Sequence, residues 1–314
     1  MRRQTNRRGF HEHGFEDLHL KLNDLQEKAQ GLENQYLFKG NIPAYPRPEF
    51  HVSHLKHDTK QAGLRGIKRD NGFRNPGTDG LLWWSLVVGP DEIKSAEKRL
   101  LETTYPDRTE EQVQSQRSFL GKFATSQAFS ETSRLGSYCF TFSLEEMLKA
   151  YSDQFCSGAQ PVMRVLKTIL YKQEVVYAVL VHSPDNQEQF SGHPLLPDDP
   201  NSVCTYKDGC FTWKSEAMCE THTYTLVVRH DEKLMEAEKV TSFPQFYVWD
   251  NVAIALHVDK QVLQFDADRL RENLRFCSRA QPAIIRPWEF DSFEEAEKVV
   301  KELWPDYPSP LERA

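Results

Sequence analysis

Residues 162–182, VMRVLKTILYKQEVVYAVLVH, are the most β-rich part of the chain. Valine, isoleucine and tyrosine recur through it, and β-branched and aromatic residues favour an extended backbone. It is much longer than the ~5–6 residues of an ordinary strand, and the polar pair Lys172 and Gln173 interrupts it near the middle. The stretch therefore predicts two strands joined by a turn or a bulge at these two residues.

Strand-like and helix-like segments lie on both sides of this stretch. Strands are predicted at residues 49–54, 81–88, 137–142, 211–213, 221–229 and 245–258. Helices are predicted at residues 90–105, 109–123, 144–155, 267–276 and 292–303. Few of the strands are separated by a crossover helix, which a doubly wound parallel sheet would require. The pattern predicts an α+β fold with mixed, largely antiparallel sheets and flanking helices.

The N-terminal part divides into a basic tail and a helix. Residues 1–14 carry four arginines without apolar partners, which predicts a flexible tail, with a nuclear address or an RNA-contacting arm as alternatives. Within residues 15–38, leucines at positions 18, 22, 25 and 32 recur at helical spacing. We expect an amphipathic helix whose leucine face packs on the protein itself or, as the alternative, binds a partner or a second copy.

The remaining boundaries follow from proline content and periodicity. Residues 39–48, KGNIPAYPRP, separate the N-terminal helix from the main domain because they hold three prolines and a glycine. The main domain is predicted to span residues 39–279, with a helical insertion near 90–123. A helical extension is predicted at residues 280–314.

Composition excludes several classes of protein. The 314 residues include 39 Lys and Arg against 46 Asp and Glu, a formal charge of −7, which argues against a protein that coats nucleic acid. Hydrophobic residues make up 39%, enough for a sizeable core. No apolar run reaches the ~20 residues that span a bilayer, and no secretory signal follows the basic N-terminus. We therefore expect a cytoplasmic or nuclear protein, no membrane contact and six reduced cysteines.

Motifs for common enzyme chemistries are missing from the sequence. It has no phosphate-binding GxxxxGK[ST] or GxGxxG, no GxSxG, no HExxH and no CxxC. Residues 51–57, HVSHLKH, favour extended backbone, which turns neighbouring histidines to opposite faces and argues against a three-histidine metal site. A second cluster could bind zinc tetrahedrally and consists of Cys204, Cys210, Cys219 and His222. The alternative is unconnected thiols around a β-hairpin that turns at Asp208 and Gly209.

A more informative pattern begins at residues 50–73, FHVSHLKHDTKQAGLRGIKRDNGF, where a strand and a helix are followed by Gly72 and Phe73. The segment resembles the first unit of ADP-ribosyltransferases of the poly(ADP-ribose) polymerase type. In that family a strand carries His-x-Thr or His-x-Ser, a helix follows, and GF or GL closes the unit. The resemblance assigns His51 and Ser53 to the first pair.

Two later segments extend the resemblance in the family's order. Residues 134–140, RLGSYCF, are similar to the family's G-x-Y-F strand, with Tyr138 as the stacking aromatic. Residues 243–256, FPQFYVWDNVAIAL, look like its last catalytic strand, and Gln245 stands where many members have glutamate. The resemblance covers residues 39–279 and implies an ADP-ribosyltransferase-like fold, preceded by the N-terminal helix.

The resemblance implies NAD as the substrate and a role for each matched residue. His51 would bind the adenosine-side ribose, and Tyr138 would stack on the nicotinamide. A carboxylate near the nicotinamide ribose would stabilise the developing oxocarbenium ion, and Gln245 cannot supply that charge. Glu174, in YKQEVVYAVL, is the alternative carboxylate, unless it is an exposed charge on an edge strand. Within the family, loss of the glutamate accompanies single-unit transfer or an inactive binding domain.

The expected function is therefore an NAD-binding, mono-ADP-ribosyltransferase-like protein whose catalysis is weak or absent. Its acceptor, protein or nucleic acid, stays open. The chain departs from the family in the long interval before Tyr138, which the insertion at 90–123 lengthens, and in the missing glutamate. Two alternatives remain: a non-enzymatic protein-interaction module that uses the N-terminal helix, and a zinc-stabilised module.

Overall fold

The computed structural model describes eleven ranges of the chain: residues 1–5, 11–32, 34, 37–38, 44–75, 77–171, 174–199, 201–216, 223–240, 249–280 and 287–314. At 249, 250 and 287 the description is of the backbone alone. In these ranges no helix has the length and apolar character needed to cross a membrane.

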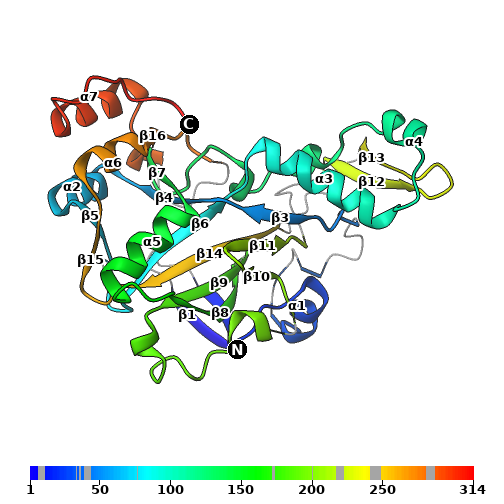
Figure 1. Cartoon of the computed structure of the whole chain (residues 1–314), viewed down its shortest axis with the longest axis horizontal. Coiled ribbons are helices and arrows are strands. Elements are labelled where there is room, and N and C mark those ends of the chain that lie inside the picture. The colour runs from blue at the N-terminus through cyan, green and yellow to red at the C-terminus, as the bar shows by residue number, and fades with distance from the viewer. Residues whose placement is uncertain are drawn as a thin grey trace.

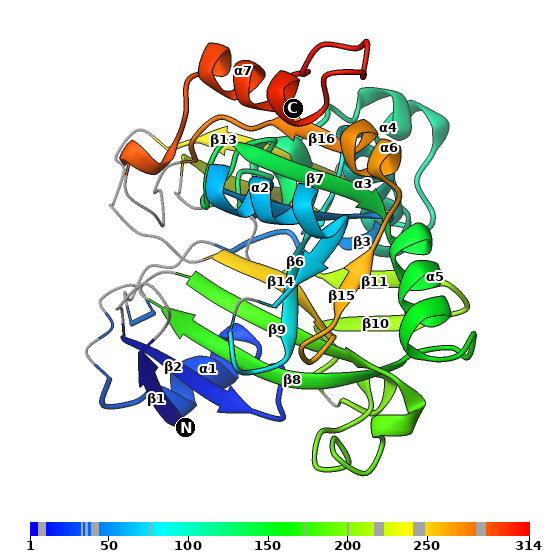
Figure 2. The same cartoon turned by 90° about the vertical axis from the view of Figure 1, so that its left-hand side faces the viewer.

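A large mixed sheet forms the body of the molecule (Figures 1 and 2). Across the described residues it has nine strands, in the order β1 (Arg2–Thr5), β2 (His11–Glu16), β8 (Val162–Tyr171), β9 (Glu174–His182), β14 (Trp249–His257), β6 (Leu81–Val87), β4 (His54–Thr59), β7 (Tyr138–Ser143) and β16 (Leu274–Phe276). Strands β9 and β14 run parallel, and the other neighbouring pairs of this sheet are antiparallel. The prediction of an α+β fold with largely antiparallel sheets is confirmed, as is the division of residues 162–182 into two strands.

Smaller sheets and helices surround this body. The small sheets are β10 (Cys204–Lys207) with β11 (Cys210–Lys214) and β3 (Glu49–Val52), β12 (Tyr224–Arg229) with β13 (Leu234–Lys239), and β15 (Val262–Gln264) with β5 (Gly72–Arg74). The helices are α1 (Leu22–Lys28), α2 (Gln61–Asp70), α3 (Pro90–Thr104), α4 (Glu110–Ser115), α5 (Leu144–Phe155), α6 (Ala267–Glu272) and α7 (Phe293–Leu303). Helices α3 and α4 and the β12–β13 hairpin form an arm that projects from the body (Figure 1).

One face of the central strands carries the main core. Residues of β6 alternate, so that Leu82, Trp84 and Leu86 are buried while Trp83 and Ser85 on the opposite face are half-buried. The Trp84 ring lies 4.9 Å from Phe73 of β5, measured between ring centroids. Helices α2 and α5 pack against β4 on this face. Burial of large aromatic rings between a sheet and its covering helices supplies the main stabilising term.

The N-terminus differs from the expectation. Strands β1 and β2 pair as an antiparallel hairpin, and β2 continues the sheet through its pairing with β8, so residues 2–5 and 11–14 are not a free tail. The predicted helix over residues 15–38 is reduced to α1, because Phe15 and Glu16 belong to β2 and pair with Thr168 and Lys167 of β8. Leu25 of α1 has no exposed surface, and the partly buried Leu22 packs against the same core, so these leucines contact the protein itself.

The predicted helix at 267–276 and the expectation of reduced cysteines also need correction. Helix α6 ends at Glu272, and β16 follows as an edge strand that pairs with β7, with Leu274 and Phe276 buried on one side. A disulfide joins Cys139 of β7 to Cys277, directly after β16. Closing a long loop in this way constrains the unfolded chain.

We predict that Trp84→Ala lowers the free energy of unfolding by about 3–5 kcal/mol, because it leaves a large cavity among packed rings. The neighbouring Trp83→Ala is the matched control, since it removes the same side chain from the half-buried face and should cost clearly less. Urea unfolding measures both variants. Equal losses would contradict the assignment of the main core to the Trp84 face.

Candidate functional site

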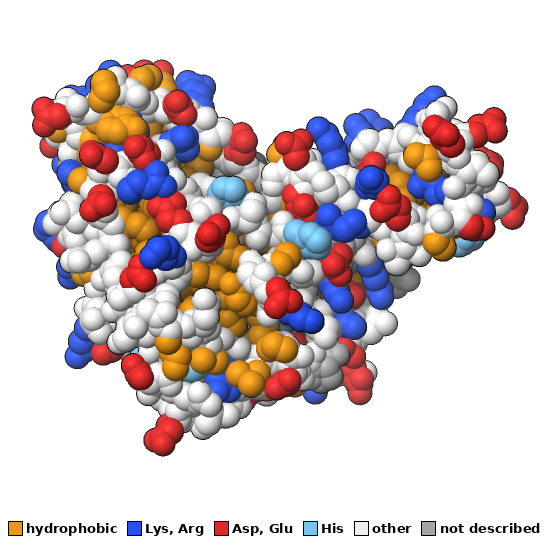
Figure 3. Space-filling model, in the orientation of Figure 1, with side chains coloured by type: hydrophobic (Ala, Val, Ile, Leu, Met, Phe, Trp, Pro, Cys, Tyr) orange, Lys and Arg blue, Asp and Glu red, His pale blue; other side chains and the backbone are white. Residues whose placement is uncertain are grey.

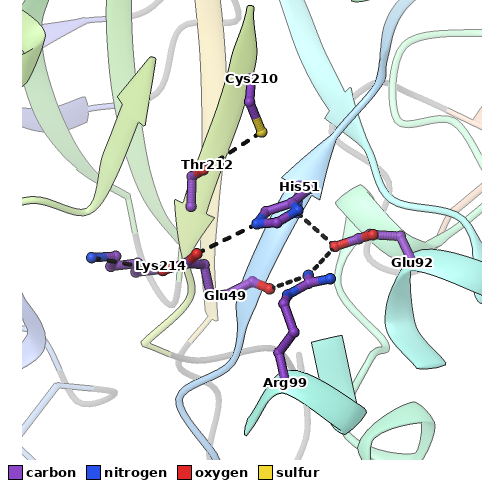
Figure 4. Close-up of polar contacts among 7 residues, drawn as sticks. All are labelled: Glu49, His51, Glu92, Arg99, Cys210, Thr212 and Lys214. Atoms are coloured by element: carbon purple, nitrogen blue, oxygen red, sulfur yellow. Dashed lines mark hydrogen bonds and ion pairs between the residues drawn. The ribbon is translucent and has the colours of Figure 1, made fainter. Parts of the chain in front are cut away.

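His51 and Ser53 lie at the junction between β3 and β4. The His51 backbone N–H donates to Glu92 Oε1 at 2.6 Å, and its ring Nε2 lies 3.4 Å from Glu49 Oε1 (Figure 4). Its side chain is 42% exposed, which leaves the ring accessible. Ser53 is exposed, and its Oγ lies 2.9 Å from His54 Nδ1.

Tyr138 begins β7 and is completely buried. Its hydroxyl donates to Asp291 Oδ2 at 2.6 Å. Burial raises the pKa of the Tyr138 phenol, and the hydrogen bond to the Asp291 carboxylate raises it further. The phenol is therefore neutral, and its hydroxyl is held by Asp291, two residues before α7 begins.

His51 and Tyr138 lie toward opposite ends of the β4–β7 ladder. Tyr138 is opposite Thr59, whereas Ser143 is opposite His54. Because a strand rises ~3.3 Å per residue, the five steps from Tyr138 to Ser143 span roughly 17 Å, and His51 precedes His54 by a further three residues. The structure does not bring these two residues into one site.

Glu174 begins β9 and is buried rather than exposed. Its Oε1 accepts a hydrogen bond from Arg134 Nη1 at 2.6 Å, with both side chains less than a tenth exposed. Arg134 lies four residues before Tyr138, so this ion pair ties the segment that leads into β7 to β9. Gln245, the other candidate for the catalytic position, lies outside the described residues.

The structure also identifies a histidine–threonine pair that the sequence analysis passed over. The strand directly before α2 is β4, and β5 begins with Gly72 and Phe73 after that helix. The His-x-Thr pattern of this strand–helix unit is therefore His57-Asp58-Thr59. The available signal was distance along the chain, since Thr59 is two residues before the helix and Ser53 is eight.

His57 and Thr59 lie beside Tyr138. Thr59 is directly opposite Tyr138 in the ladder, and His57 is opposite Phe140. The His57 Nδ1 lies 3.0 Å from the Trp83 carbonyl oxygen, and burial lowers the pKa of the His57 ring. A neutral imidazole with one nitrogen bound to a carbonyl keeps the second nitrogen as an acceptor.

Gly136 explains how the segment before Tyr138 can pass so close to β4. Its φ of 123° is a conformation that favours glycine, and a Cβ at this position would lie 2.5 Å from the Thr59 carbonyl oxygen. The close approach fixes Tyr138 against Thr59. His57, Thr59, Gly136 and Tyr138 therefore lie together where β4 ends and β7 begins.

The predicted zinc cluster is described only in part. Cys219 and His222 lie outside the described residues, Cys210 is exposed, and Cys204 is buried. Among the described residues no group of three or more candidate ligands is arranged to hold a metal ion.

Cys204 instead contacts a buried histidine. Its Sγ lies 3.6 Å from His19 Nδ1, which also lies 3.3 Å from Asp199 Oδ2. Burial alone would lower the pKa of His19, but the neighbouring Cys204 and Asp199 raise it to about 10 through charge and hydrogen bonds. His19 is therefore a buried imidazolium at neutral pH.

We predict that the His19 interaction weakens as pH rises. The folded-state pKa is about 10 and the unfolded value is 6.5, so the stabilisation is complete below pH 6.5 and is lost as pH rises toward 10. The wild-type free energy of unfolding should fall by more than about 1 kcal/mol between pH 6.5 and 9.5. His19→Gln should flatten that slope, and an unchanged slope in urea titrations would contradict the assignment.

We predict that Arg134→Met lowers the free energy of unfolding by about 3–5 kcal/mol, because it removes the cation that binds the buried Glu174 carboxylate at 2.6 Å. The double variant Arg134→Met with Glu174→Leu removes both charges and should recover much of that loss. Thermal and urea unfolding of the two single variants and the double variant measure the coupling. Additive losses would contradict a direct buried pair.

The comparisons with known proteins add no family to these observations. No protein-family model, no curated protein and no solved structure matches the chain. The group formed by His57, Thr59, Gly136 and Tyr138 is therefore the observation from which a function can be inferred.

Proposed function

We propose that this chain is an ADP-ribosyltransferase-like protein that binds NAD, with transfer of single ADP-ribose units that is weak or absent. One observation carries the proposal: β4, α2 and β5 follow one another as the family's first unit does, and Thr59 of that unit is directly opposite Tyr138. Segments separated by 79 positions thus supply the histidine, the threonine and the aromatic ring to one place.

The residue types in this group suit the parts of NAD. The Thr59 hydroxyl and the second nitrogen of His57 can exchange hydrogen bonds with ribose hydroxyls. The Tyr138 ring offers a flat surface for the nicotinamide, and stacking of aromatic rings contributes about 0.5–1.5 kcal/mol beyond burial. In this assignment His57 and Thr59 take the roles that the sequence suggested for His51 and Ser53.

Weak transfer follows from the charges of the two candidate residues for the catalytic position, Glu174 and Gln245. A transferase needs a carboxylate to stabilise the oxocarbenium ion that forms as nicotinamide leaves. Glu174 is already paired with Arg134 at 2.6 Å, which neutralises its field. Gln245, at the position suggested by the resemblance, carries no charge at all.

Access to Tyr138 requires that the segment before α7 moves. Asp291 accepts the Tyr138 hydroxyl, and its backbone exchanges two hydrogen bonds with the Ser137 side chain at 2.9 and 3.1 Å. NAD would have to displace these three contacts to stack on the ring. Each hydrogen bond contributes about 0.5–1.5 kcal/mol, so displacing all three would cost about 1.5–4.5 kcal/mol of binding free energy.

We predict that Asp291→Ala binds NAD up to about tenfold more tightly than the wild type, because it removes one of the three hydrogen bonds that NAD has to displace. The two backbone bonds to Ser137 remain in this variant. Thr59→Val should weaken NAD binding in either background, since it removes a hydroxyl and keeps the side-chain shape. Isothermal titration calorimetry with NAD measures each affinity, and nicotinamide release measures transfer.

Tyr224→Phe is the matched control for Tyr138→Phe, because it removes the same hydroxyl from a half-buried tyrosine on the arm, away from β4 and β7. It should leave NAD affinity unchanged. Tyr138→Phe keeps the ring and removes only the hydroxyl, so it separates stacking from folding. The proposal is wrong if neither the wild type nor Asp291→Ala binds NAD.

A further inference from the structure

A cleft of about 640 Å³ lies between the arm and the body. None of its lining residues belongs to the Tyr138 group, which consists of His57, Thr59, Gly136 and Tyr138. The walls of the cleft come from distant parts of the chain: α3 on one side, and β3 with the end of β11 on the other. A volume of this size falls within the ~300–1,000 Å³ of small-molecule sites. Figure 3 shows Lys and Arg side chains gathered where the arm joins the body.

The lining of the cleft is richer in basic residues, relative to acidic ones, than the chain as a whole. Its four basic residues are Lys21, Arg47, Arg99 and Lys214, and its three acidic residues are Glu49, Glu102 and Glu216. The local formal balance is therefore 4 − 3 = +1, whereas the whole chain has a formal charge of −7. Glu92, which pairs with Arg99, lies just outside this lining, and counting it gives 4 − 4 = 0. The cleft is thus less negative than the chain as a whole, which favours it as the place where an anion binds.

Arg99 is fixed in place before any ligand arrives. Its Nη2 donates to the Glu49 carbonyl oxygen at 2.7 Å and also to Glu92 Oε1 (Figure 4). Its buried Nε–H has no acceptor among the described residues. The Arg99 side chain as a whole is 31% exposed, so its guanidinium can donate to a ligand oxygen from N–H groups outside these two bonds.

The outer cations are held only loosely. Arg47 is 69% exposed and lies 3.7 Å from Glu216, and Lys214 is 53% exposed and lies 3.7 Å from Glu49. Both separations are longer than a hydrogen bond, and such exposed pairs contribute little. For Lys21 no ion pair is found within the described ranges. These side chains can turn to a ligand at small cost.

We propose that this cleft binds a small phosphate-bearing anion. Arg99 would supply a fixed donor at the wall, and Arg47, Lys214 and Lys21 would close around the charged oxygens. A multiply charged phosphate competes better for these cations than single carboxylates at 3.7 Å, since charge-assisted hydrogen bonds are the strong ones. This site shares no residue with the Tyr138 group that is proposed to bind NAD, and its test does not depend on that proposal.

Titration calorimetry with inorganic pyrophosphate at low ionic strength tests the proposal. The double variant Arg47→Glu with Lys214→Glu should lower pyrophosphate affinity at least about tenfold, because it reverses two cleft charges. The matched control is Lys94→Glu with Lys301→Glu, which makes the same change in net charge at exposed positions outside the cleft. The control should bind pyrophosphate as the wild type does.

Two results would overturn the proposal. One is a wild-type protein that does not bind pyrophosphate. The other is an equal loss of affinity in both double variants, which would mean attraction by overall charge rather than a site. Circular dichroism and the melting temperature check that each variant is folded, and Lys21→Glu, at an exposed position, is a milder third variant that should lower affinity by a smaller factor.

Discussion

Strand β14 holds the two halves of the large sheet together. It pairs in parallel with β9 over Trp249–Leu256 and in antiparallel fashion with β6 over Ala253–His257. Its residues Ile254 and Leu256 have no exposed surface. Without this strand, the β1-β2-β8-β9 group and the β6-β4-β7-β16 group would have no shared ladder. Parallel pairing also needs a long connection, and the chain between β9 and β14 supplies β10 to β13, part of which builds the arm and one wall of the cationic cleft.

The Tyr138 group exists because two ladders end at different places. Strand β4 pairs with β6 only as far as Lys56 opposite Ser85, whereas its pairing with β7 continues to Thr59 opposite Tyr138. Past Lys56 the backbone pairing of β4 with β6 ends, and the His57 side chain contacts the Trp83 carbonyl oxygen of β6 instead. The sheet thus separates between β4 and β6, and α2 and β5 pack at this end.

Helices and strands whose ends are determined by neighbouring residues could be predicted from the sequence. Helix α5 was predicted at residues 144–155 and lies there, because Ser143 caps it and its apolar residues keep helical spacing. Strands β1 and β2 were missed because edge strands rich in arginine and histidine look like a solvated tail. Strand β16 was missed because its three residues continue a helical pattern, and only the free edge of β7 makes them extended. The choice between His51 and His57 depends on the register of β4 against β7, which no local pattern contains.

Buried charges, rather than apolar packing, position the segment that leads into Tyr138. Lys56 Nζ donates to the Thr132 carbonyl oxygen at 2.6 Å, and two residues later Arg134 binds Glu174. Burying ions is costly, and replacing such pairs with apolar residues often raises stability. Their value here is geometric: they anchor a chain without regular structure to β4 and β9, and Gly136 then lets it touch Thr59. Tyr138 is therefore placed by polar contacts on both sides: Arg134 and Lys56 hold the segment before it, and Asp291 binds its hydroxyl.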